Sequence, residues 1–302
     1  MKKLVLLILM PFILGILNVS AQSELNDFEG ETTAKIFNSQ KMKSAVLTKN
    51  LVAKMIVKAV TKKYLDNNPA LYNGAYTATT IIKGGKICVK SSNLNTVTIT
   101  IPEGGKTKTI CYFPYIKKGY YTYSSTDAKQ AQQQLEQMRK GNVEKTGETM
   151  NIMGHKCTVY KVKYESSTDS AGMKVKTIIN NEYAISNDPS LPEANKEIIP
   201  GVHGAPLKFA TNMVSQTNSD MINMDVRIAI ASIVTSITPR TVADSEFEVP
   251  ADIKLINIDG NEKEYFKLYS ENTKYLKKNK LWVDPAINED RIYDNLQEEW
   301  DY

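Results

Sequence analysis

Imidazoles and catalytic motifs are scarce in this sequence, which has only His155 and His203. A Ser-His-Asp hydrolase needs a nucleophile, a base and an orienting acid in register, and no Gly-x-Ser-x-Gly turn is present. Both histidines stand beside glycines, where turn residues are expected. His155 and Cys157 supply two potential zinc ligands on one strand, and the sequence indicates no third. The sequence therefore predicts no enzyme, no metal site and no cofactor, with a secreted hydrolase as the remote alternative.

Cysteine is also rare, with three residues and no Cys-x-x-Cys pair that would indicate thiol-redox chemistry. Cys88 and Cys111 lie on segments that read as nearby strands, so they are the expected disulfide if the protein is exported. Such a bond closes a loop of about twenty residues and is worth roughly 3 kcal/mol in the chain-entropy model. Cys157 is then expected as a buried, inert thiol.

Long hydrophobic runs are absent outside the N-terminus. Residues 1–21 have a basic start, an apolar run and the small residues Val19-Ser20-Ala21, which together predict a cleaved export signal. The run is shorter than the roughly 20 residues that span a bilayer, and Pro11 and Gly15 interrupt it. An uncleaved anchor is the alternative. The predicted mature chain begins at Gln22, is periplasmic or extracellular, and has no lipid-anchoring cysteine at its start.

Strong charge of one sign is lacking as well, because the formal net charge is +5. No arginine cluster is present, so nucleic acid is not an expected partner. Residues 255–302 form a C-terminal extension, and Asp284–Tyr302 carries seven acidic residues against the single Arg291. The body before this tail is correspondingly basic, which suits either an anionic surface or a solvated exterior.

Helical periodicity occurs in two segments. Residues 22–74 read as an N-terminal extension with a long helix at Lys41–Leu65, whose lysines recur on another face from its apolar stripe. A packed core, a partner and a membrane surface all remain open as the contact of that stripe. A second helix is expected after the cap Ser125-Thr126-Asp127 and up to Gly141. The stripe residues that we select as candidate apolar ligand contacts are Val52, Met55, Ile56, Val60, Leu135 and Met138.

Alternating apolar and polar residues dominate from residue 75 to residue 254, which reads as one antiparallel β domain. Gly84-Gly85 and Gly104-Gly105 are favoured hairpin turns, since both central residues can take positive φ. The clearest strand is Ile222–Ile230, in which Met224, Val226, Ile228 and Ile230 are further candidate ligand contacts. Asn187–Pro206 is expected to be a long loop, and Phe247–Pro250 to end the β region. The expected strands are 76–83, 86–91, 95–101, 106–113, 119–123, 148–153, 155–165, 173–180, 183–186, 207–213 and 222–230.

Short motifs within this domain resemble those of exported Bacteroidota proteins of unknown function. Ile152-Met153-Gly154-His155-Lys156-Cys157 is similar to their Ile-x-Gly-x-x-Cys signature, and Phe247-Glu248-Val249-Pro250 to their closing Phe-x-Ile-Pro segment. Gly204-Ala205-Pro206-Leu207 matches their Gly-x-Pro-Leu loop. These families, including the GLPGLI-type proteins, resemble the outer-membrane lipoprotein carriers in fold.

The resemblance implies a mainly β fold with α: a curved, incomplete antiparallel half-barrel with two or more amphipathic helices on its concave side. It further implies a non-enzymatic envelope protein that binds an apolar ligand, either a lipid or the acyl chain of a lipoprotein. A structural or surface-interaction protein with a fully packed interior is the alternative. No motif decides between them, because binding of this kind depends on an apolar interior.

Overall fold

The protein is mostly β and consists of a single open sheet. The computed structural model describes residues 28–46, 55, 74–92, 94–125, 142–170, 173–192, 199, 201–219, 222–259 and 262–282. Its sheet has twelve strands in the order β12-β6-β5-β4-β3-β2-β1-β11-β10-β9-β8-β7. These strands are β1 (Gly30–Val46), β2 (Gly74–Lys83), β3 (Lys86–Ser91), β4 (Thr96–Glu103), β5 (Lys106–Phe113), β6 (Lys118–Ser125), β7 (Asn142–Ile152), β8 (His155–Ser170), β9 (Met173–Ser186), β10 (Ala205–Ser219), β11 (Ile222–Pro239) and β12 (Lys254–Asn257).

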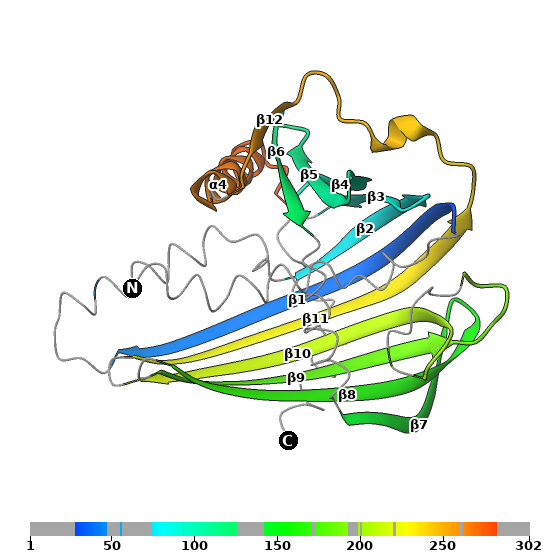
Figure 1. Cartoon of the computed structure of the whole chain (residues 1–302), viewed down its shortest axis with the longest axis vertical. Coiled ribbons are helices and arrows are strands. Elements are labelled where there is room, and N and C mark those ends of the chain that lie inside the picture. The colour runs from blue at the N-terminus through cyan, green and yellow to red at the C-terminus, as the bar shows by residue number, and fades with distance from the viewer. Residues whose placement is uncertain are drawn as a thin grey trace.

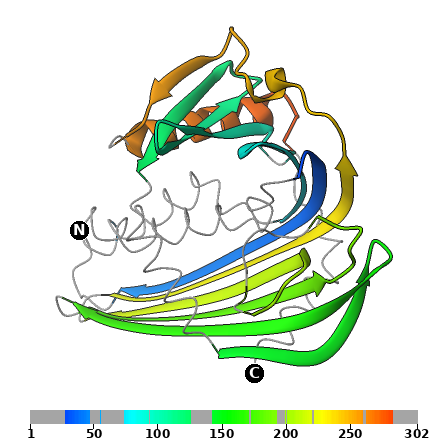
Figure 2. The same ribbon diagram turned by 45° about the vertical axis from the view of Figure 1, so that its right-hand side comes forward.

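Strand β1 joins two antiparallel meanders, β2–β6 and β7–β11, into this one sheet. It pairs with β11 from Gly30↔Pro239 to Val46↔Ile222, and with β2 from Gly30↔Ile82 to Asn38↔Gly74. The sheet thus begins well before residue 75, inside the segment expected to be a separate N-terminal extension. Figures 1 and 2 show the long strands β8–β11 and β1 as a broad curved floor, from which β2–β6 bend up and over.

The expected long helix at Lys41–Leu65 is wrong at its beginning, because residues Lys41–Val46 form the end of β1. Seventeen consecutive residues of β1 align with β11, and this ladder outweighs the helical spacing of the lysines. Apart from Met55, which is helical, residues 47–65 lie outside the described part of the chain, as do residues 126–141 of the second expected helix.

The two glycine pairs have the backbone conformation expected of hairpin turns. Gly84 and Gly85 have φ of 52° and 78°, and Gly104 and Gly105 have φ of 58° and 76°. Positive φ at both central residues is the type I′ geometry that matches the twist of the flanking strands, and glycine adopts it at little cost. The predicted hairpins at these two sites are confirmed.

Strands β8, β9 and β11 run further than expected. Strand β9 is continuous through Asn180-Asn181-Glu182, where we expected a break between two strands. Asn181 and Glu182 are buried and pair with residues on both neighbouring strands, so ladder hydrogen bonds and burial override their preference for turns.

Phe247–Pro250 does not end the β region: Asp244–Phe247 forms the 3-10 turn η3, and β12 follows it in parallel with β6.

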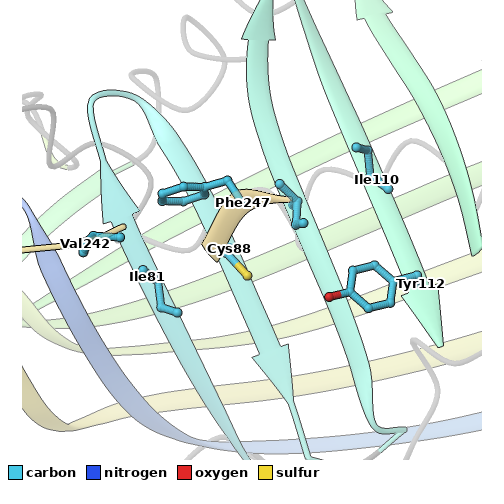
Figure 3. Packing of buried hydrophobic residues seen from close by; sticks show 7 residues of the cluster. Ile81, Cys88, Ile110, Tyr112, Val242 and Phe247 are labelled. Atoms are coloured by element: carbon cyan, nitrogen blue, oxygen red, sulfur yellow. The ribbon is translucent and has the colours of Figure 1, made fainter. Parts of the chain in front are cut away.

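Residues 240–259, which we call the strap, first cross the convex face of β2–β6 and then continue into the edge strand β12. In Figure 3 the strap residues Val242 and Phe247 lie over Ile81 and Cys88, in the cluster that also contains Ile110 and Tyr112, and the long strands of the other half lie behind this layer. The face with these side chains therefore points away from the interior of the curve. Ion pairs and hydrogen bonds hold the strap: Arg240 with Glu31 and Glu246, Lys83 and Lys86 with Asp244, Lys117 with Asp252, and Thr122 with Asp259.

Helix α4 (Glu262–Lys278) covers the concave face of β5 and β6. Its residues Leu268, Asn272 and Leu276 recur every four positions and are buried, with Leu268 packed beside Cys111, Phe113 and Tyr120. Asn272 is fully buried and its Nδ2 donates to the Leu94 carbonyl at 2.8 Å. The part of the chain that the structure describes contains this one α-helix, so the expectation of two or more helices is not borne out.

The strap carboxylates predict an acid-sensitive C-terminal segment. Hydrogen bonds from Lys86 and Arg240 lower the pKa of Asp244 and Glu246, and the hydrogen bond from Lys117 does the same for Asp252. Since these pKa values are lower in the folded than in the unfolded protein, the stabilisation is complete above the unfolded values near pH 4 and is lost as the pH falls below them. We expect the urea midpoint to decline below about pH 4. Replacing Asp244 by Asn should flatten that decline, and an unchanged slope would contradict the assignment.

Candidate functional site

The apolar residues predicted on β11 lie on the concave face. Val226 and Ile228 are only 1% and 4% exposed, and Ile230 is half-buried beside them. Through the paired residues of β1 to β5 they share a face with Cys111, which α4 covers. Exposed Arg227 between them confirms the expected alternation. Met224 lies in the same strand.

The other candidate contacts are placed differently. Met55 is 70% exposed and so does not face a packed interior. Val52, Ile56, Val60, Leu135 and Met138 lie outside the described residues.

Three residues that were not selected from the sequence complete the apolar row. Met213 of β10 pairs with Ile228 on one side and with Ile179 of β9 on the other, and Ile179 in turn pairs with Tyr164 of β8. The row Tyr164–Ile179–Met213–Ile228 therefore crosses four strands on one face. Its signal was present as alternation within β9 and β10, but only the register could align the residues across strands.

Polar groups adjoin this row on the concave face. The hydroxyls of Thr177 and Ser215 lie 3.3 Å apart and are buried, on the row of residues next to Ile179 and Met213. On the other side, Asn181 Nδ2 donates to the Tyr183 hydroxyl at 3.3 Å, and burial raises the pKa of that tyrosine. The Asn181 Oδ1 is buried with no hydrogen-bond partner among the described residues. Apolar and polar groups thus stand side by side on this surface.

The predicted disulfide between Cys88 and Cys111 is contradicted, since both are buried free thiols. Cys88 of β3 pairs with Ile99 of β4, whereas Cys111 of β5 pairs with Thr98, the residue before Ile99. The two cysteines consequently lie on opposite faces with β4 between them, about 9–10 Å apart at the usual strand spacing. Their Cβ vectors also point apart, which excludes a bond without backbone movement. The predicted buried thiol at Cys157 is confirmed.

All three thiols should be unreactive in the native protein. Burial raises the pKa of Cys88, Cys111 and Cys157, and the thiolate is the reactive form. We expect slow labelling by Ellman's reagent at neutral pH, and rapid labelling of all three in denaturant. Non-reducing peptide mapping that finds a Cys88–Cys111 peptide would contradict this placement.

His155 has a structural contact. Its Nδ1 lies 2.8 Å from Asp188 Oδ2, and the other carboxylate oxygen accepts hydrogen bonds from Ser190 N at 2.9 Å and Ser190 Oγ at 2.6 Å. These bonds lower the pKa of Asp188 to about 2. The serine hydroxyl binds the carboxylate and not the imidazole, so the order of a catalytic triad is not formed. The contact fixes the turn after β9 against the β7–β8 hairpin.

The described residues do not bring potential metal ligands together. Cys157 Sγ is buried and donates to the His155 carbonyl, while the His155 ring bonds Asp188, so these two side chains do not converge. Within the described ranges, no three His, Cys, Asp or Glu side chains form a group able to hold a metal ion. None of the helices described there is both long and apolar enough to cross a membrane.

Comparisons with known proteins give no functional guide. No family model matches the chain, and no curated protein matches it. The crystal structure of the outer membrane protein Omp33 from Acinetobacter baumannii aligns with 8% identity and a TM-score of 0.14, over 68% of this chain and 97% of that chain. So low a TM-score does not show a shared fold.

Proposed function

We propose that this chain is an exported, non-enzymatic binding protein of the cell envelope. Its concave sheet would hold an apolar ligand, either a lipid or the acyl chain of a lipidated partner. The proposal is supported chiefly by the continuous row Tyr164–Ile179–Met213–Ile228 on the concave face of an open, curved sheet. Ligand sites are mostly apolar concave surfaces with a few placed polar groups, and Thr177, Ser215 and Asn181 provide such groups beside the row.

The carrier-like half-barrel belongs to the same proposal. The export signal in residues 1–21 delivers the chain to the periplasm or beyond.

A packed interior is the second candidate, and one observation favours it. Val226 and Ile228 are 1% and 4% exposed in a structure without a ligand. If the concave side is already filled by the chain itself, the protein has a structural or surface-interaction role.

Binding of a fluorescent fatty-acid probe distinguishes the two functions. We expect saturable binding to the purified protein at micromolar concentrations and displacement by an acylated peptide. Replacing half-buried Ile230 by Trp should fill part of the concave surface. Probe binding should weaken about tenfold or more, because the probe then loses apolar contact comparable to burying one side chain.

The matched control is Ala229→Trp, on the same strand with its side chain on the convex face. Circular dichroism establishes that each variant is folded. Absence of probe binding to folded wild-type protein, or equal weakening by both tryptophans, would reject the ligand site and favour the packed-interior role.

A further inference from the structure

Exposed apolar side chains gather at the C-terminal end of α4. Tyr115, Tyr275 and Leu281 are 44%, 37% and 41% exposed. Tyr115 comes from the turn between β5 and β6, and its ring stacks on that of Tyr275 with centroids 6.0 Å apart and an interplanar angle of 18°. Segments distant in sequence thus bring two tyrosine rings together at this end of the helix, and half-buried Trp282 follows Leu281 in the chain.

The helix cap fixes the backbone at Leu281 and Trp282, directly after the last turn of α4. Lys280 has φ of 56°, its N–H donates to the Lys277 carbonyl at 3.2 Å, and Leu281 N donates to the Leu276 carbonyl at 2.9 Å. These two bonds define a Schellman motif, which turns the chain back beside the last helical turn. The backbone position of both residues is therefore set by hydrogen bonds.

This C-terminal end of α4 is also strongly basic. Lys274, Lys277, Lys278 and Lys280 are all exposed, and the sequence from Asn272 to Trp282 has no acidic residue. No ion pair joins these four lysines to a carboxylate of the described residues, whereas nearby Lys118 is paired with Glu271 at 2.5 Å. Lys277 Nζ lies 4.8 Å from the centroid of the Trp282 ring. Lysines favour the C-terminus of a helix, but the dipole does not call for exposed aromatic rings among them.

We propose that the C-terminal end of α4 docks the protein on an anionic phospholipid membrane. We call its exposed rings and lysines the aromatic–lysine patch, which consists of Tyr115, Lys274, Tyr275, Lys277, Lys278, Lys280, Leu281 and Trp282. Tyrosine and tryptophan rings suit the headgroup region because one end is apolar and the other polar. Lysine side chains lay their aliphatic stems along apolar surface and extend the ammonium group toward anionic headgroups. The charge and the ring chemistry of the patch complement such a membrane together. The proposal stands independently of any ligand on the concave face.

Tryptophan fluorescence gives a local readout of docking. The chain has two tryptophans, so Trp300→Phe leaves Trp282 as the reporter in the full-length protein. We expect a blue shift and flotation with vesicles of phosphatidylcholine containing about one-third phosphatidylglycerol, and neither with phosphatidylcholine alone. The full chain is used because the acidic residues of 284–302 follow the patch in sequence and counteract binding.

Charge variants test which surface binds. Each lysine near an anionic membrane is worth roughly fivefold in affinity, so the triple change Lys274→Gln, Lys277→Gln and Lys278→Gln should weaken binding about a hundredfold. The matched control is Lys156→Gln, Lys163→Gln and Lys174→Gln, which removes the same charge from exposed positions on β8 and β9.

Several outcomes would overturn the proposal. These are absence of binding to the anionic vesicles, equal weakening by the two triple variants, and equal binding to neutral vesicles. A Trp282 shift with soluble polyglutamate but not with vesicles would assign the patch to an acidic protein instead.

Discussion

Replacing Glu182 by Met is expected to lower the free energy of unfolding by about 3–5 kcal/mol, because it leaves a buried charge without its partner. Glu182 Oε1 accepts from Lys208 Nζ at 2.6 Å, and the two side chains are only 7% and 10% exposed. Glu182 also pairs in register with Lys161 of β8, so its removal leaves two lysines on this face of the sheet without that carboxylate. Urea-induced unfolding measures the change.

Two further variants isolate the cause. The double change Glu182→Met and Lys208→Met should recover stability to within about 1 kcal/mol of the wild type, since an apolar pair replaces a buried ion pair at little net cost. Glu165→Met removes the same residue type from the Glu165–Lys176 pair on β8 and β9, whose side chains are 48% and 49% exposed. That exposed pair should contribute far less to stability, because solvent screens the two charges. Equal losses for Glu182→Met and Glu165→Met would show that burial does not determine the effect.

Phe113→Ala is expected to cost about 3–5 kcal/mol and to loosen α4 from the sheet. The Phe113 side chain is fully buried, and its ring meets Tyr269 of α4 edge-on with centroids 4.8 Å apart. Loss of the ring opens a cavity between β5 and the helix. Hydrogen exchange should therefore accelerate in Glu262–Lys278 more than in β8–β10.

Tyr269→Phe is the matched control, because it keeps the aromatic packing and removes only the hydroxyl. That hydroxyl lies 3.5 Å from the Tyr120 hydroxyl and 3.6 Å from Cys111 Sγ, which are long contacts. We expect a loss below about 1.5 kcal/mol. If Phe113→Ala leaves exchange in α4 unchanged, this packing does not hold the helix.

Local patterns predicted much of the strand content. The paired glycines of both hairpins require positive φ, and the alternation around Val226 and Ile228 places one set of side chains in the core. These are properties of neighbouring residues, so sequence alone carries them. Val226 and Ile228 of β11 lie on a buried face for the same reason.

Where local preference and long-range pairing disagree, the sequence was misleading. Lys41–Val46 has helical spacing but completes a ladder with β11, some 180 residues further along the chain. Asn181 and Glu182 read as a break but lie at the centre of β9. Asn272 interrupts the apolar stripe of α4, and its buried amide nitrogen donates to the carbonyl of Leu94, which is distant in sequence. Packing gains outweigh propensity in each case.

The sequence by itself determined that this chain folds as a β protein with glycine hairpins and has no recognisable catalytic motif. The tertiary structure alone decided which strands are neighbours, and with them the opposite faces of Cys88 and Cys111, the row from Tyr164 to Ile228, and the buried Glu182–Lys208 pair. The physical reason is that hairpin turns and alternation act over a few residues. Sheet order and curvature depend on β1 pairing with both β2 and β11, which no local pattern encodes.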